Sequence, residues 1–279
     1  MEAEKSRLAD DSLRPPTSWQ GQAQSLVEES PVSFVLNGEV YAVMLATPHD
    51  LADFARGFLW TEDIVHNPEE ILALEVEATA DGAAVYLQLH AAARDRAASH
   101  RRALPGASAC GLCGCPDFRG LQPFAPLPAA RNLPDLGLIH ATMAELAAQQ
   151  CLHQQSGNCH AAALRFSDGE VLVREDIGRH NAVDKVIGAA LARGAVPGSA
   201  DVLAVSSRLP FEIVRKALAW RIPLVAAISG VSSMAVDIAR KNHVQLVGFV
   251  RDGRATLYCD GKAAPPGSHG QKKRPQPVS

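Results

Sequence analysis

Three cysteines stand close together near the middle of the chain, as Cys110, Cys113 and Cys115 in the run Cys-Gly-Leu-Cys-Gly-Cys. A C-x-x-C pair can ligate zinc, form a redox disulfide or carry sulfur as a persulfide. A closed zinc site needs four protein ligands, so it would require Cys115 and a distant histidine as well. The flanking glycines, the following proline and four upstream arginines favour an exposed loop with a thiolate. The pattern therefore favours a mobile nucleophilic cysteine, which suits the relay of a sulfur atom between proteins.

The composition agrees with an intracellular role for these thiols. Six cysteines in 279 residues are far too few for a disulfide scaffold, and we interpret Cys151, Cys159 and Cys259 as structural thiols. A net charge of −3 argues against a non-specific nucleic-acid binder. No apolar run approaches the roughly 18–20 residues of a membrane span, and the polar first 30 residues contain no secretory signal. We therefore expect a cytoplasmic protein that binds neither nucleic acid nor membrane.

Three turns carry side chains that suit a phosphate-bearing ligand. The serine-rich turns 206–210 and 229–233 each follow an expected parallel strand and lead into a helix N-terminus, where free N–H groups favour anions. The turn 249–254 carries Arg251 and Arg254, whose guanidinium groups can bind phosphate in a bidentate manner. Taken singly, each turn is better explained as a helix cap or a hairpin turn. Together, three turns at one edge of a sheet favour a phosphate-bearing ligand.

Residues 174–185 form a second polar cluster, with the sequence Arg-Glu-Asp-Ile-Gly-Arg-His-Asn-Ala-Val-Asp-Lys. On a helix that begins near Arg179, His180 lies four residues before Asp184, and such a pair could orient an imidazole for proton transfer. Capping by Asp176 and surface pairs of about 0.2–0.5 kcal/mol each would explain the same residues. The spacing leaves both explanations open.

The elements that would position these residues fall into two units. The first unit, residues 31–134, is a small α+β unit with a hairpin at Asn37-Gly38 and a long segment without periodicity from about residue 91 to 134. The second unit, residues 135–261, alternates strands with helices, which predicts parallel strands joined by right-handed crossovers. Residues 1–30 and 262–279 are predicted to be disordered tails, the latter basic.

The individual elements follow from apolar periodicity and turn residues. We expect helices over 48–60, 140–151, 180–193, 210–220 and 232–241, and strands over 32–36, 40–45, 71–76, 85–89, 161–166, 171–173, 202–206, 224–229, 244–250 and 255–258. Continuous apolar strands such as 224–228 fit burial on both faces of a sheet.

These motifs resemble those of one family, the formate dehydrogenase accessory sulfurtransferases or FdhD family. Residues 108–114 resemble its SSCGxCG loop, and residues 175–185 are nearly identical to its EDxGRHNAVDK block. Further stretches resemble its HAAAL, SGRxxxE, SAPSS and GFxR segments, at residues 160–164, 206–212, 229–233 and 248–251. The chain departs from the pattern at Ser207, at Gly230-Val231 and at Cys115, where the family often has glycine, Ala-Pro and lysine.

The resemblance implies a fold and an activity. The fold would be α/β, with a cytidine-deaminase-like C-terminal domain behind a smaller α+β N-terminal domain, in a homodimer. The absence of an H-x-E motif agrees with a deaminase-like fold without the deaminase zinc. The activity would be sulfurtransfer: a persulfide is accepted from a cysteine desulfurase and passed to the molybdenum bis(molybdopterin guanine dinucleotide) cofactor. That cofactor is the bound substrate, it is destined for the formate dehydrogenase catalytic subunit, and no protein-bound metal is expected.

The resemblance also implies residue roles. Cys110 would carry the persulfide, and Cys113 would be a second carrier or the resolving thiol, which the sequence does not separate. The candidate cofactor ligands are Ser206, Arg208, Ser229, Ser232, His180, Asn181, Phe249, Val250, Arg251, Asp252, Gly253 and Arg254. Two other functions stay open: a cofactor-binding chaperone without chemistry, and a zinc-binding module that uses the three clustered cysteines and a histidine.

Overall fold

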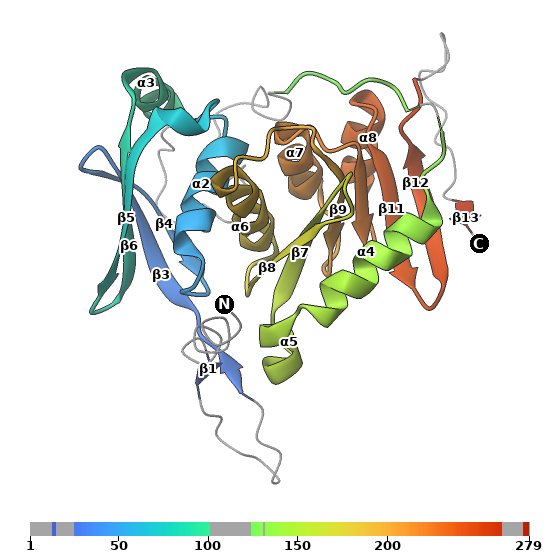
Figure 1. Ribbon diagram of the computed structural model, residues 1–279, viewed down its shortest axis with the longest axis horizontal. Coiled ribbons are helices and arrows are strands. Elements are labelled where there is room, and N and C mark those ends of the chain that lie inside the picture. The colour runs from blue at the N-terminus through green and yellow to red at the C-terminus, as the bar shows by residue number, and fades with distance from the viewer. Residues whose placement is uncertain (1–12, 15–24, 101–123, 131, 264–275, 279) are drawn as a thin grey trace.

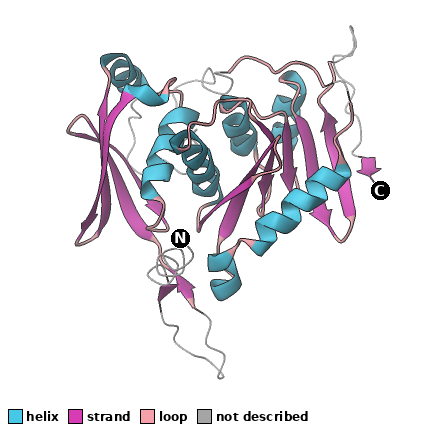
Figure 2. Cartoon of the chain, in the orientation of Figure 1, coloured by secondary structure: helices cyan, strands magenta, loops and turns pink. Residues whose placement is uncertain are grey.

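Two β-sheets enclose a pair of packed helices. The structure is a computed structural model that describes residues 13–14, 25–100, 124–130, 132–263 and 276–278. Figure 1 shows, from left to right, a four-stranded sheet, helices α2 (Leu51–Thr61) and α6 (Arg179–Ala192), and a seven-stranded sheet that α4 (Leu136–Ala148) crosses in front. Figure 2 shows the same arrangement by type of element. The architecture is thus mixed α/β, as the sequence predicts.

The four-stranded sheet belongs to the N-terminal unit. Its strands are β3 (Ser30–Leu36), β4 (Glu39–Ala46), β5 (Ile71–Thr79) and β6 (Gly82–Leu89), in the order β4-β3-β6-β5. Asn37 and Gly38 join β3 to β4 with positive φ angles of 50° and 88°, so the predicted hairpin is confirmed. Val32, Phe34 and Leu36 alternate along β3 and are buried in the main core. This sheet therefore has one face in the core, against α2.

A helix occupies part of the segment for which the sequence predicts no regular structure. Helix α3 spans Ala91–His100, within the range 91–134. Alanine is the strongest helix former, and five of these ten residues are alanine. Only Ala93 and Ala97 are buried, so the segment lacks the apolar stripe that reveals a helix in a sequence. The short 3-10 helix η1 (Pro68–Glu70), which precedes β5, is capped by Asn67.

Helices α2 and α6 touch through their backbones. A Cβ atom placed on Gly57 of α2 would lie 1.8 Å from the carbonyl oxygen of Asp184, and one on Gly188 of α6 would lie 1.8 Å from that of Asp53. Both glycines are therefore required by the close approach of the two helices. Trp60 of α2 also packs against Trp220, which directly follows the helix Phe211–Ala219, with ring centroids 5.5 Å apart. The N-terminal and C-terminal units thus share one core.

The seven-stranded sheet has the order β13-β12-β11-β10-β9-β7-β8. Its strands are β7 (His160–Phe166), β8 (Val171–Asp176), β9 (Ala200–Val205), β10 (Leu224–Ala227), β11 (Gln245–Arg251), β12 (Arg254–Asp260) and β13 (Gln276–Val278). Strands β9, β10 and β11 are parallel, as predicted. Strand β7 runs antiparallel to both neighbours, because a tight turn joins it to β8 and α6 then crosses over to β9.

Helices cover both faces of this sheet. Helices α6, α7 (Phe211–Ala219) and α8 (Ser233–Lys241) share the main core with alternate strand residues such as Ala162 and Leu164. Helix α4 packs on the opposite face, where its Ile139 and Met143 meet the intervening residues of the strands. One predicted helix, 140–151, is in fact two, because the chain breaks at Gln149 and Gln150 before α5 (Cys151–Ser156). The other predicted helices of this unit are present within a few residues.

Short strands occur inside both ranges for which the sequence predicts disorder. Strand β1 (Leu13–Arg14) pairs with β2 (Leu26–Val27), and β13 pairs with β12 at the edge of the large sheet. At these residues the structure differs from the prediction, since backbone pairing needs no apolar side chains. Within the described part of the chain, no helix has the length and apolar character needed to span a bilayer.

Candidate functional site

The clustered cysteines lie outside the described residues. Cys110, Cys113 and Cys115 follow α3, which ends at His100, and the described chain resumes at Phe124. The Phe124 side chain is partly buried against the main core. The described residues that flank the candidate nucleophiles are therefore two anchors in the folded chain, the end of α3 before them and Phe124 after them.

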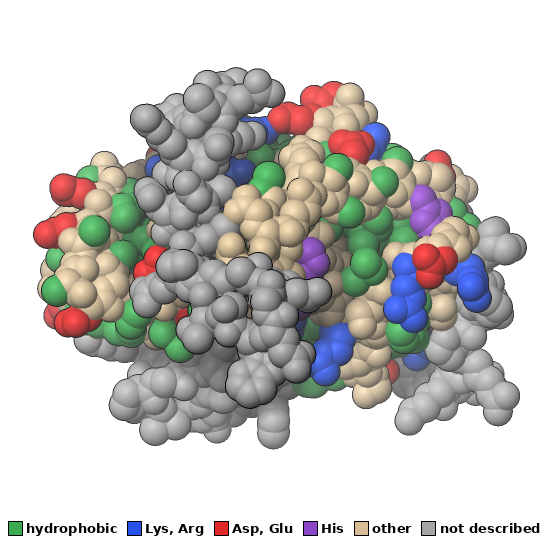
Figure 3. Space-filling view, turned by 90° about the horizontal axis from the view of Figure 1, so that it is seen from below, with side chains coloured by type: hydrophobic (Ala, Val, Ile, Leu, Met, Phe, Trp, Pro, Cys, Tyr) green, Lys and Arg blue, Asp and Glu red, His purple; other side chains and the backbone are tan. Residues whose placement is uncertain are grey.

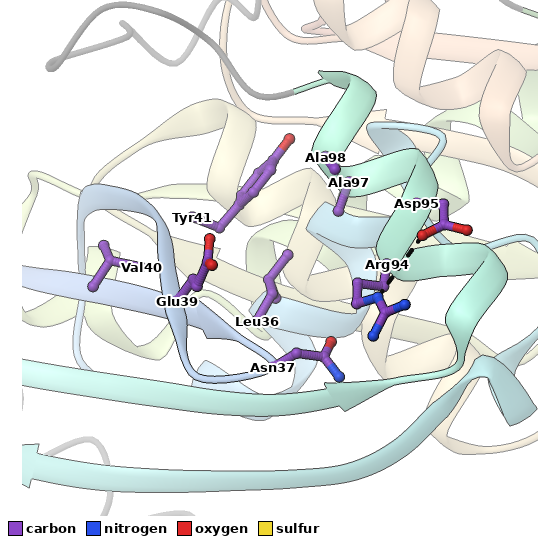
Figure 4. A pocket seen from close by; sticks show the side chains of 9 residues that line it. All are labelled: Leu36, Asn37, Glu39, Val40, Tyr41, Arg94, Asp95, Ala97 and Ala98. Atoms are coloured by element: carbon purple, nitrogen blue, oxygen red, sulfur yellow. Dashed lines mark ion pairs between the residues drawn. The ribbon is translucent and has the colours of Figure 1, made fainter.

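A pocket of about 340 Å³ lies at the first of these anchors, between the β3–β4 hairpin and α3. Figure 4 shows the side chains of Leu36 and Tyr41 on the hairpin side and of Arg94 on the helix side. Arg94 forms an exposed ion pair with Asp95, with 3.8 Å between Nε and Oδ1. The pocket contains none of the residues that the sequence predicts to bind the cofactor.

The isolated cysteines differ from one another in exposure. Cys159 and Cys259 are 4% and 5% exposed, which agrees with structural thiols. Burial, with the nearby charges of Glu175 and Asp176, raises the pKa of the Cys159 thiol far above its usual value. Cys151 is exposed at the start of α5, so burial does not support its interpretation as a structural thiol.

The three turns after β9, β10 and β11 meet at one edge of the large sheet. The backbone N–H of Leu209 donates a hydrogen bond to the carbonyl of Gly230 at 2.9 Å, and the carbonyl of Leu209 accepts a hydrogen bond from the N–H of Ser232 at 3.1 Å. The backbone N–H of Phe249 donates to Ser229 at 3.0 Å. A Cβ on Gly230 would lie 3.1 Å from the ring of Phe249, so the ring packs over this turn. The proximity expected from parallel strands is therefore present.

The hydroxyl groups of two candidate serines are occupied by the backbone. Ser206 Oγ accepts a hydrogen bond from Ala161 N at 2.8 Å, which joins β7 to the end of β9. Ser232 Oγ accepts from Ala235 N at 3.2 Å and so caps α8. For Ser232, helix capping explains the residue fully. Arg208 lies between these turns with an exposed side chain.

The hairpin between β11 and β12 presents the two arginines. Asp252 and Gly253 form its tip with φ angles of 53° and 70°, and Arg251 pairs with Arg254 across it. All four residues are exposed, and the guanidinium carbon of Arg251 lies 6.0 Å from the ring centroid of Phe249. Figure 3 shows basic side chains at this end of the lower face and acidic ones at the opposite end, over the four-stranded sheet.

Val250 is buried, unlike its exposed neighbours in the same turn. Its side chain is 2% exposed and belongs to the core beneath α4, so it cannot contact a ligand from the sheet edge. Only its backbone is available for the cofactor contact that the sequence predicts.

Most of the polar block 174–185 is buried, and neither explanation of it from spacing is right. His180 and Asp184 do not pair. Lys216 Nζ binds both carboxylate oxygens of Asp184, at 2.7 and 2.8 Å, and Thr61 Oγ1 donates to the same group at 2.7 Å. His180 Nε2 instead lies 3.8 Å from Glu212 Oε2 on α7. The spacing could not reveal this, because the partners come from α2 and α7.

Asp176 is the centre of a second buried network. Its carboxylate accepts hydrogen bonds from the backbone of Thr47 and Gly178 and from the Asn181 amide, and it forms a 2.7 Å ion pair with Lys185. Lys185 is fully buried and also donates to the Thr47 carbonyl at 3.0 Å. The Asn181 amide nitrogen donates to Leu45 O at 2.9 Å as well. This predicted cofactor ligand thus holds β4 against α6.

Two residues that the sequence analysis did not propose lie at the same sheet edge. His160 begins β7 directly opposite Asp176, and Arg179 begins α6. Burial comes first among the causes that lower the pKa of His160, followed by the charges of Arg179, His153 and Arg208. A histidine directly before a predicted strand, at the end of a polar turn, was the available signal.

The described residues contain no group of three or more His, Cys, Asp or Glu side chains that could hold a metal ion. The three clustered cysteines fall outside that part of the chain, so the zinc alternative stays a prediction.

Comparisons with known proteins connect this geometry to a family. The model of the FdhD/NarQ family matches residues 27–264. The chain belongs to the FdhD/NarQ family. It is 40% identical over 240 residues to the sulfur carrier protein FdhD of Bordetella bronchiseptica, covering 85% of this chain and 86% of that one. It is 43% identical over 232 residues to the protein of the same name from Variovorax paradoxus, covering 82% and 83% of the two chains.

A solved structure supports the fold. The crystal structure of a protein from Desulfotalea psychrophila, described as a formate dehydrogenase accessory protein, superposes with a TM-score of 0.66 at 23% identity. The superposition covers 88% of this chain and 96% of that one. The FdhD/NarQ match therefore includes the cysteine cluster, both buried networks and the strand-end turns in one continuous range.

Proposed function

We propose that this protein is a sulfur carrier that passes persulfide sulfur from a cysteine desulfurase to the molybdenum bis(molybdopterin guanine dinucleotide) cofactor of formate dehydrogenase. The observation that supports it most is the family match over residues 27–264, a range that includes the C-x-x-C pair. Relatives about 40% identical are named sulfur carrier proteins. The proposal includes a cytoplasmic homodimer and a cytidine-deaminase-like C-terminal domain.

The chemistry begins at Cys110. Its thiolate attacks the outer sulfur of the desulfurase persulfide, which forms Cys110–S–SH and releases the desulfurase thiolate. If Cys113 is the resolving thiol, its thiolate attacks the inner sulfur, forms a Cys110–Cys113 disulfide and releases hydrosulfide for the cofactor. If Cys113 is a second carrier, the outer sulfur moves to it and the Cys110 thiolate is restored. The first route needs an external thiol to reduce the disulfide before the next cycle.

The strand-end turns are the proposed cofactor site. The exposed guanidinium groups of Arg251 and Arg254 offer paired N–H donors to phosphate oxygens, and Phe249 is 39% exposed beside them. A hairpin tip with two positive φ angles holds the arginines opposite each other without help from a ligand. The buried networks around Asp176 and Asp184 keep α6 against the N-terminal unit, and so support this edge of the sheet from within.

The sulfur-carrying role can be tested by mass spectrometry. The protein is incubated with a cysteine desulfurase and cysteine, and the intact mass is measured before and after a reducing agent is added. The wild type is expected to gain the mass of a labile sulfur atom, Cys110→Ala to gain none, and the control Cys151→Ala, which removes an exposed cysteine outside the cluster, to gain it fully. A wild type without labile sulfur, or Cys110→Ala and Cys113→Ala variants that both load normally, contradicts the mechanism.

The cofactor site can be tested separately. Arg251→Ala and Arg254→Ala are each expected to weaken GDP binding about tenfold in calorimetry, because each removes a charge-assisted contact to phosphate. Arg193→Ala, on the exposed end of α6 far from the turns, is the control. Unchanged affinity in both hairpin variants removes this site assignment. Activation of formate dehydrogenase by a Cys110/Cys113 double variant would instead favour a chaperone role, and stoichiometric zinc would favour the zinc module.

A further inference from the structure

A cluster of basic side chains surrounds the first residue of β7. His160 lies between the end of β8, which leads to Arg179, and the end of β9, which leads to Arg208. Ser206 fixes this junction, since its N–H donates to Ala161 O at 3.0 Å while its hydroxyl accepts from Ala161 N. On the other side, His153 reaches Cys159 O through Nδ1 at 2.9 Å. Three strands and the first turn of α6 thus place these cationic groups around one histidine.

The acidic groups of this region are already engaged elsewhere. The Glu175 carboxylate accepts the backbone N–H groups of Leu152 and His153 at the start of α5. Asp176 is held by Lys185 and three hydrogen-bond donors, as described above. Glu212 faces His180, and although burial opposes it, His180 and the charge of Arg179 lower the pKa of the Glu212 carboxyl. No carboxylate in the described part of the chain forms an ion pair with Arg179 or Arg208.

Donor groups in the same place lack acceptors. Helix α6 has Gly178 at its N-cap and no side-chain cap, so its first N–H groups add partial positive charge. The buried Nε of Arg179 has no hydrogen-bond partner among the described residues. His180 is only 5% exposed, and its Nε2 has Glu212 Oε2 as its charged neighbour at 3.8 Å. Buried donors are nearly always paired, so the unpaired Nε of Arg179 points to a missing anion.

We propose that His160, Arg179 and Arg208, together with the uncapped start of α6, bind a phosphate or pyrophosphate group at a site separate from the β11–β12 hairpin. Strands β7 and β11 are three steps apart in the sheet, which at about 4.8 Å per step is roughly 14 Å. The two clusters therefore lie over different strands of the sheet. The site itself follows from the geometry alone, and only the identity of its natural ligand as part of the cofactor rests on the proposed function.

The proposal has a direct reporter in His160. Burial and the positive charges around it lower the pKa of the His160 imidazole, although the charge of Asp176 opposes them. A bound phosphate group would reverse the sign of the local charge and favour the protonated ring. Anion binding and protonation of His160 must therefore strengthen each other, and pyrophosphate should bind more tightly as the pH falls.

The experiment uses the full-length protein with carbon-13 in its histidine rings. Inorganic pyrophosphate is titrated while the His160 signal, assigned with His160→Gln, is followed between pH 5 and 8. We expect pyrophosphate to raise the His160 pKa by about one unit. We also expect its affinity to fall about tenfold or more in Arg179→Gln and in Arg208→Gln, because each loses a charge-assisted contact. Arg193→Gln, at the opposite end of α6, should bind as the wild type does.

Two results would overturn the proposal. One is a His160 signal that responds to neither pyrophosphate nor GDP. The other is an equal loss of affinity in Arg193→Gln, which would mean screening of the whole surface rather than a site. Arg208 is exposed, so its variant keeps the test valid if Arg179→Gln fails to fold. A response to GDP alone supports the site with an esterified ligand, and a response to pyrophosphate supports a free anion. Persulfide loading at Cys110 is a separate measurement, so either proposal can fail alone.

Discussion

The ion pair between Lys185 and Asp176 offers a sharp test of how the polar block 174–185 is used. Lys185→Met keeps the length and most of the volume of the side chain but removes its charge. The Asp176 carboxylate then stays buried with its hydrogen bonds to Thr47, Gly178 and Asn181, but without a cation. If the block had been a surface feature, the loss would be about 0.2–1 kcal/mol.

The structure predicts a larger loss. Both side chains are 0% exposed and their charged atoms lie 2.7 Å apart. Removing one partner of a buried pair costs about 3–5 kcal/mol, because the other charge is left uncompensated. A typical folded protein has only about 5–15 kcal/mol in total, so Lys185→Met should lower the free energy of unfolding by about a fifth or more.

A double-mutant cycle in urea isolates the pair. Asp176→Asn removes the other charge, and the double variant should lose less stability than the sum of the single losses, by up to about 3 kcal/mol. Lys241→Met, at the exposed end of α8, is the control and should change stability by less than about 0.5 kcal/mol. The reasoning is refuted if Lys185→Met behaves like that control, or if the losses in the cycle simply add.

Two further predictions concern the joint between the units. Gly57→Ala should destabilise the protein by about 1–3 kcal/mol or more, because the new methyl group would overlap the Asp184 carbonyl. The control Gly137→Ala on α4 should change stability little, because its methyl group meets only the end of the Asp135 side chain. Equal urea midpoints for the two variants would contradict this prediction. Burial, then the charge of Lys185, lowers the pKa of His49 from 6.5 to about 3, so the unfolded chain binds its proton first as the pH falls through 6.5. Acidification from pH 7 to pH 5 should therefore lower the free energy of unfolding by about 2 kcal/mol through His49 alone. Urea unfolding of His49→Gln should show a correspondingly smaller loss between these two pH values. An identical loss in the variant and the wild type would show that His49 titrates normally.

Local patterns predicted most of the fold. Asn37-Gly38 fixed a hairpin because both residues tolerate positive φ, and the alternation of strands with helices predicted the parallel strands β9, β10 and β11. Helix α3 was missed because propensity without an apolar stripe leaves no period to detect. The direction of β7 was also missed, since pairing between distant strands is decided by packing and not by the strand's own residues.

The sequence predicted those parts of the site whose proximity follows from the order of strands and helices along the chain. The turns after parallel strands had to meet at one edge, and they do, so Ser206, Ser229 and Phe249 lie close together. The partners of the polar block were not predictable, because Thr61 and Lys216 reach Asp184 from elements 123 and 32 residues away. Helical spacing suggested a partner four residues away, and tertiary contacts supplied different ones.

Burial divides the family-specific residues into two groups with different tasks. Asp176, Asp184 and Lys185 are each at most 2% exposed, and their contacts hold neighbouring helices and strands together. They therefore cannot contact a substrate. Arg251 and Arg254 are exposed and form no ion pair within the described residues, so their charges are available to a substrate. A buried charge requires a fixed partner, whereas an exposed charge without one is free to bind a ligand. It follows that variants of the first group should lose stability, and that variants of the hairpin should lose affinity while the fold is retained.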